Sequence, residues 1–286
     1  MSKPPTPLRR LAKALGTFHN ISYYAPEMKA FADLGLPRYW PAYMAYRSAP
    51  MGEVPASVVA STFYNFAPDR VAEGVPVAWQ STDPATVLAL RDRSIQAALH
   101  RALPDHDASQ VNDVADLALA PILACEAGAR PLFAAHQELA PPANPLLRLW
   151  FAATLWREYR GDGHNVALAA ASIDGIECHV LLAAKGVANR DIITKIRGWT
   201  QTQWNDAHDR LVARDLINAD GSFADAGAKL RAAIEAHTDE LATAPWKALG
   251  DAGTSDLLAV MEPLVDQLVS SGAVAGRWPP PKPPVD

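Results

Sequence analysis

Residues 189–225 are the segment that most restricts how this chain can fold. Residues 189–196 have the pattern of a short helix, Gly198-Trp199-Thr200 that of a turn, and residues 201–214 that of a second helix. The second helix carries an apolar face of Trp204, Ala207, Leu211 and Val212. Asp220-Gly221 then indicates a tight turn between two short extended pieces. A helix, a turn, a helix and a small hairpin in this order predict a winged helix.

The rest of the chain predicts a mostly α protein with two helical halves. Asp83-Pro84 is a helix start signal, and Asp107 or Ser109 opens another helix. Pro141, Pro142 and Pro145 form the clearest linker. We therefore expect a helical domain over 1–140, which could hold a degenerate winged helix. The winged-helix domain would follow over 141–286, with a proline-rich tail.

Residues 150–164, WFAATLWREYRGDGH, begin as an apolar helix and end in the densest polar run of the chain. Gly161 and Gly163 bracket Asp162, which predicts a turn or a helix junction at this point. The run is the best candidate for chemistry or ligand binding. Its polar members are Arg157, Glu158, Arg160, Asp162 and His164.

The two halves resemble each other weakly. Trp40 and Arg47 precede Trp150 and Arg157 by the same 110 positions. Such an internal repeat would make one chain a pseudo-dimer and would place Arg47 and Arg157 at a shared interface. Chance matching in alanine-rich sequence is the alternative explanation.

Composition excludes several classes of function. A net charge of −5 argues against a broad nucleic-acid-binding surface, although a local basic patch is compatible with it. Two cysteines are too few for a disulfide scaffold and are typical of a reducing cytoplasm. The chain shows no signal peptide and no apolar run long enough to cross a membrane.

Five motifs resemble those of a largely uncharacterised actinobacterial family. They are FYNFAPDRV from Phe63, ARPLFAA from Ala129, LWREYRGDGH from Leu155, RGWTQTQW from Arg197 and HTDELATAPWKALG from His237. The family is described as helix-turn-helix, with a C-terminal half similar to MarR-type regulators, so the resemblance implies a fold. Related sequences usually read Arg-Gly-Leu after the second helix, whereas this chain has Arg214-Asp215-Leu216. The Asp places negative charge where a DNA-facing wing would begin.

Two readings of the helix over 201–214 stay open, DNA binding and packing alone. Base contacts need side chains that reach base edges, and phosphates need basic residues. Asp206 and Asp209 oppose phosphate contact. The candidates for DNA contact are Gln201, Gln203, Asn205, Arg210 and Arg214.

The leading hypothesis is a regulator-like protein that binds a small anionic or polar-aromatic molecule between its halves. Arginine binds carboxylates and phosphates with a two-pronged fork, and clustered aromatic residues form apolar walls. The predicted ligand-binding residues are Arg47, Arg157, Arg160, His19, Tyr24, Tyr43 and Asn65.

The alternative is an enzyme that keeps the winged helix as a scaffold. His164 would then be the acid or base, oriented by Asp162 and accompanied by Glu158, while Arg157 and Arg47 would hold an anionic substrate. A third reading makes the polar run an ion-pair network between domains. No histidine or cysteine spacing predicts a metal site, no motif names a cofactor, and homodimerisation stays open.

Overall fold

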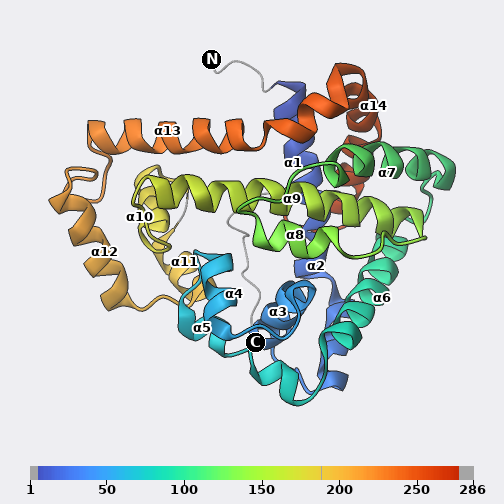
Figure 1. Cartoon of the computed structure of the whole chain (residues 1–286), viewed down its shortest axis with the longest axis horizontal. Coiled ribbons are helices and arrows are strands. Elements are labelled where there is room, and N and C mark those ends of the chain that lie inside the picture. Colours follow the sequence, from blue (N-terminus) through green and yellow to red (C-terminus); the bar gives the residue numbers. More distant parts are fainter. Residues whose placement is uncertain (1–5, 188, 277–286) are drawn as a thin grey trace.

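The computed structural model describes residues 6–187 and 189–276 and is mostly α-helical, as predicted (Figure 1). The 26-residue helix α9 (Pro145–Ala170) crosses the middle of the molecule, with α13 (Asp225–Leu241) above it in the view of Figure 1. The other longer helices are α1 (Pro7–His19), α3 (Tyr39–Ser48), α6 (Pro84–Ala102), α7 (Ala108–Leu123), α12 (Gln201–Ala213) and α14 (Thr243–Ser270). Shorter ones are α2 (Ile21–Tyr24), η1 (Pro26–Leu34), η2 (Ala49–Met51), α4 (Ala56–Phe63), α5 (Pro68–Ala72), η3 (Val77–Gln80), α8 (Pro131–Gln137), α10 (Glu177–Ala184) and α11 (Arg190–Arg197).

Short polar side chains start several of these helices. Asp83 accepts a hydrogen bond from the Thr86 N–H at the start of α6, and Asp107 caps α7 in the same way. Thr200 and Gln203 form a reciprocal capping box at the start of α12. These predicted starts are confirmed, because each cap depends only on residues two or three positions apart.

Three apolar cores hold the helices together. The first lies among α1, α7, α9 and α14, and the second among η1, α3, α4 and α6. The third joins the end of α9 to α10, α11, α12 and α13. The predicted domain boundary at 140/141 falls between α8 and α9. Helices from both sides of it contribute to the first core, so the division into two domains stays a prediction.

The predicted break at Gly161 and Gly163 is wrong. α9 runs through both glycines to Ala170, and Asp162 and Gly163 are buried in it. A Cβ atom at position 163 would lie 2.7 Å from Nη1 of Arg130. This glycine therefore provides room for the Arg130 guanidinium, which donates to the carbonyls of Tyr159 and Leu241. Packing against neighbouring helices keeps the helix continuous.

The segment after α12 forms a tight turn rather than paired strands. Gly221 adopts a φ of +84°, and the Asn218 N–H donates to the Ser222 carbonyl at 2.8 Å. A single antiparallel bridge joins Ile217 to Phe223, and the described residues contain no longer strand. The turn that Asp220-Gly221 indicated is present, but its two extended arms are reduced to this one bridge.

Candidate functional site

The best-defined polar cluster forms where α3 meets α9. Oε1 of Glu158 accepts from Nη2 of Arg47 at 2.8 Å and from Nη1 of Arg157 at 2.6 Å. Glu158 is only 3% exposed and Arg47 only 8%. Arg47 and Arg157 thus share one buried carboxylate. The internal repeat itself stays a prediction.

A chain of hydrogen bonds extends this cluster toward α1. Nη1 of Arg47 donates to the Tyr43 hydroxyl at 3.0 Å and lies 3.4 Å from that of Tyr23. The Tyr23 hydroxyl lies 2.8 Å from Nε2 of His19, whose Nδ1 lies 2.8 Å from Oγ1 of Thr154. His19 is therefore held within the protein behind the tyrosines.

A cavity of about 260 Å³ opens beside this cluster. Aromatic rings make most of its wall, two arginines supply the charge, and none of the described lining residues is Asp or Glu. The wall consists of Asn20, Tyr23, Tyr24, Tyr39, Trp40, Tyr43, Phe66, Arg157, Ile196 and Arg197. We call this the aromatic cavity. Its volume is close to the lower end of the range for small-molecule pockets.

The surroundings of the aromatic cavity are electropositive. Burial alone would raise the pKa of Tyr43, yet the charges of Arg47, Arg197 and Arg157 bring it below its ordinary value. Burial lowers the pKa of His19 far below its ordinary value, and the charges of Arg157 and Arg47 lower it further. In both residues the arginine charges act in the same direction, and these charges favour an anion at this place over a cation.

A smaller cavity of about 110 Å³ adjoins the first, and Phe66, Arg157 and Arg197 line both. We call it the polar cavity. The predicted residues Arg47, Asn65, Glu158, Asp162 and His164 also line it. The predicted ligand-binding residues are therefore divided between the two cavities. Tyr24 and Tyr43 line the aromatic cavity, Arg47 and Asn65 line the polar cavity, and Arg157 lines both.

The sequence suggested that Asp162 orients His164, and this prediction is wrong. Oδ2 of Asp162 accepts from the N–H groups of Leu132 and Phe133, at 3.0 and 2.9 Å, at the start of α8. Nδ1 of His164 instead lies 2.9 Å from Oγ1 of Thr238 on α13. Two residues along a helix are about 200° apart around its axis, so the two side chains point to different neighbours.

Burial keeps several histidines neutral and predicts loss of stability in acid. It lowers the pKa of His136 and His164 to about 4 and of His179 to about 3. The unfolded chain takes up these protons near pH 6.5, so stability falls as pH drops from 6.5 toward 4. Burial raises the pKa of Asp162 to about 7. The contribution of this carboxyl to the free energy of unfolding is present at low pH and lost as pH rises through 7.

We expect the histidines to outweigh Asp162, with a net loss of roughly 1–3 kcal/mol of unfolding free energy from pH 7.5 to pH 5. Urea unfolding across this range measures it. An Asp162→Asn variant removes the opposing contribution and should lose stability more steeply with acid. A flat profile in both proteins would contradict the assignment.

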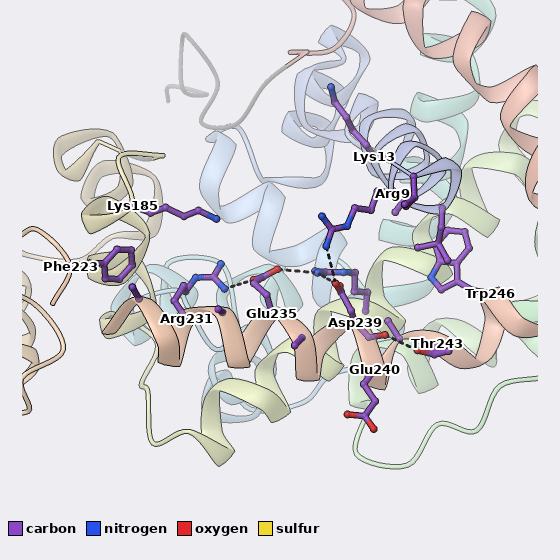
Figure 2. Close-up of a pocket in the computed structure, with 18 residues that line it drawn as sticks. Arg9, Lys13, Lys185, Phe223, Arg231, Glu235, Asp239, Glu240, Thr243 and Trp246 are labelled. Carbon is purple, nitrogen blue, oxygen red and sulfur yellow. Dashed lines mark hydrogen bonds and ion pairs between the residues drawn. The ribbon is translucent and has the colours of Figure 1, made fainter. Parts of the chain in front are cut away.

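Arg160 lies outside both cavities. It pairs with Glu235 at 3.3 Å and with Asp239 at 3.0 Å, on α13. It lines a groove of about 1240 Å³ that runs along α13 beside α1. Figure 2 shows this groove, with Arg9 of α1 reaching Asp239 and Arg231 lying beside Glu235 on α13. Together with Arg157 it also lines a third pocket, of about 240 Å³, so its predicted role beside Arg157 stays a prediction.

The basic residues of α12 are held by acidic residues before and within α10. Arg210 pairs with Asp174 at 2.6 Å and with Glu177 at 2.9 Å, and Arg214 lies 3.3 Å from Glu177. Gln201 donates to Asn205 at 2.7 Å, and Gln203 serves the capping box. All five predicted DNA-contacting side chains thus have partners inside the protein.

Sequence reasoning missed Arg197, which lines both cavities. It is the last residue of α11, and its guanidinium lies 4.2 Å from the Phe66 ring centroid. Only its place in the motif RGWTQTQW singled it out in the sequence, because the aromatic ring under its guanidinium, that of Phe66, lies 131 positions away. Tyr39, Trp40 and Phe66 are also in the cavity wall, and their clustering in the first half was the available signal.

A family model described as a helix-turn-helix family matches residues 8–275. The chain belongs to this family. Within the helix-turn-helix protein, α11 and α12 joined by Gly198-Trp199-Thr200 are the helix pair that the sequence pattern indicated. Searches of curated proteins and of solved structures gave no match.

Two features are absent from the described residues of the helix-turn-helix protein. None of their helices is long and apolar enough to span a bilayer. No three of their His, Cys, Asp and Glu side chains form a group that could hold a metal ion.

Proposed function

We propose that this member of the helix-turn-helix family is a regulator-like protein that binds a small anionic aromatic molecule in the aromatic cavity. The observation that carries the proposal is the composition of the cavity wall. Two guanidinium groups, of Arg157 and Arg197, face a space whose other walls are mainly aromatic, and its described lining has no carboxylate. Such a wall favours a flat ring with one negatively charged group.

The finer description of the fold belongs to this proposal. The order of α11, α12, the Ile217–Phe223 bridge and α13 supports a winged helix with a one-bridge wing. The resemblance of the second half to MarR-type regulators, the actinobacterial relationship and the internal pseudo-dimer are proposed with it. The cavity would then lie between the two halves, since α2 and α3 come from the first and Arg157 and Arg197 from the second.

DNA is a second proposed partner, with less support from the structure than the small molecule. Contact with phosphates needs basic side chains that are free to leave their present partners. Arg210 and Arg214 hold Glu177, which is 4% exposed, so their release would leave that buried carboxylate uncompensated. A mobility shift that is stable at moderate salt and lost in the Arg210→Ala, Arg214→Ala double variant would establish DNA binding.

The small-molecule proposal predicts a specific loss in the Arg157→Gln variant. Benzoate is the probe, because it combines one ring with one carboxylate. We expect titration calorimetry to show binding of benzoate to the full chain and binding at least about 10-fold weaker in the variant, since one charged hydrogen-bond donor is lost. Phenol, which lacks the negative charge, should bind more weakly than benzoate to the full chain.

The matched control is Arg148→Gln, on the same helix. Arg148 pairs with Asp116 at 3.0 Å and lines neither cavity. It should bind benzoate as the full chain does, and circular dichroism should show that both variants keep their helices. Equal benzoate affinity in the Arg157→Gln variant and the full chain would count against the proposed site.

A further inference from the structure

The helix α11 is shared between two of the three apolar cores. Ile193 belongs to the third core, while Ile196 is buried in the second, with Ile192 packed against it. α11 therefore connects the helix pair α11–α12 to the first half of the chain. Movement of α11 would carry α12 with it, because only Gly198-Trp199-Thr200 separates them.

One segment of the first half, residues 62–70, holds this region through hydrogen bonds. The Ala67 N–H donates to the Arg197 carbonyl at 2.9 Å, and Arg70 donates to the Lys195 carbonyl at 3.1 Å. The Asn65 carbonyl accepts from Nε1 of Trp199 and from Nε2 of His179, both at 3.1 Å. We call residues 62–70 the clasp.

The clasp and the cavities share residues. Phe66 of the clasp lines both cavities and lies under the guanidinium of Arg197, whose own carbonyl the clasp binds. The Tyr64 backbone has a φ of +57°, in the left-handed region that non-glycine residues seldom occupy. The cavity walls and the attachment of α11 therefore have Phe66 and Arg197 in common.

Charge makes this attachment sensitive to an anion. The guanidinium groups of Arg47, Arg157 and Arg197 all line the polar cavity, with Glu158 between the first two. Burial lowers the pKa of Arg197, Tyr43 and Cys178 act to raise it, and the positive charges of Arg157 and Arg47 act to lower it. Like charges in a poorly solvated place repel each other much more strongly than in water.

We propose that an anion held between Arg157 and Arg197 fastens α11 to α9 and the clasp, and that its absence loosens the α11–α12 pair. The anion adds a contact to both guanidinium groups and reduces their repulsion. The attached arrangement is thereby favoured over an arrangement in which α11 moves away. This inference rests on the proposed function, and it adds the direction in which ligand binding acts on the helix-turn-helix.

Hydrogen exchange of the full chain, read by mass spectrometry, tests the proposal. With benzoate, amides of residues 190–213 should exchange at least about 5-fold more slowly, which corresponds to about 1 kcal/mol of added protection. Amides of α7, on the far side of the first core, should be unchanged. Benzoate that binds by calorimetry but leaves exchange over 190–213 unchanged would overturn this inference and leave the proposed function standing.

A second arm needs no ligand. The Arg157→Gln variant removes one of the repelling charges, and we expect slower exchange over 190–213 in the ligand-free variant than in the ligand-free wild type. Arg157→Lys keeps the charge and should exchange as wild type does. If benzoate fails to bind at all, the proposed function fails for this ligand class. The inference then depends on this arm, and unchanged or faster exchange in Arg157→Gln would overturn it.

Discussion

Replacing Glu158 by Gln is expected to remove about 3–5 kcal/mol from the free energy of unfolding. The amide keeps the size of the side chain but removes the charge that Arg47 and Arg157 share. Arg47 is 8% exposed, so bulk solvent compensates its charge poorly once the carboxylate is lost. Urea unfolding monitored by circular dichroism measures the loss.

The control for this variant is Glu235→Gln. Glu235 also accepts from two arginines, Arg160 and Arg231, but its side chain is 37% exposed. Solvent screening should limit its effect to about 1 kcal/mol or less. If Glu158→Gln lost no more stability than this control, the buried cluster would not be the stabilising feature described above.

The Gly227→Ala variant should lose at least about 3 kcal/mol, because the added methyl group has no room. A Cβ atom at this position would lie 1.8 Å from the Leu216 carbonyl oxygen. The obstacle is backbone, so a rotamer change cannot relieve it. Either α13 or the segment after α12 must shift, and both carry buried residues of the third core. Urea unfolding measures the loss of unfolding free energy, and a thermal melt should show a lower melting temperature.

Gly16→Ala is the matched control for the glycine variant. Gly16 lies inside α1, and a Cβ atom there would meet nothing within 4 Å. We expect a gain of about 0.5–1 kcal/mol, because alanine restricts the unfolded chain more than glycine does. Similar changes of unfolding free energy in the two variants would show that Gly227 does not lie close to the Leu216 carbonyl.

Features that depend on neighbours in sequence could be predicted well. Asp83, Asp107 and Thr200 start their helices, since a cap uses residues two or three positions away. The apolar spacing of 201–214 placed Trp204, Ala207 and Leu211 on one face, and all three are buried. The polar run after Trp150 also predicted where charged side chains would gather.

Only the tertiary structure decided how that polar run is used. Successive residues of a helix point about 100° apart, so a dense run distributes its side chains over several neighbours. Glu158 meets Arg47 of α3, Asp162 meets the start of α8, and Arg160 meets α13. The sequence names these residues but not their partners.

The same limit applies to the glycines and to Arg197. Gly161 and Gly163 read locally as a turn, yet packing of α9 against its neighbours keeps the helix continuous. Arg197 joins the cavity because α11 docks on residues 62–70, far away in the sequence. Short-range hydrogen bonding and apolar periodicity depend on residues that are close in the sequence. Which distant side chains share a carboxylate or a cavity depends on how the helices pack.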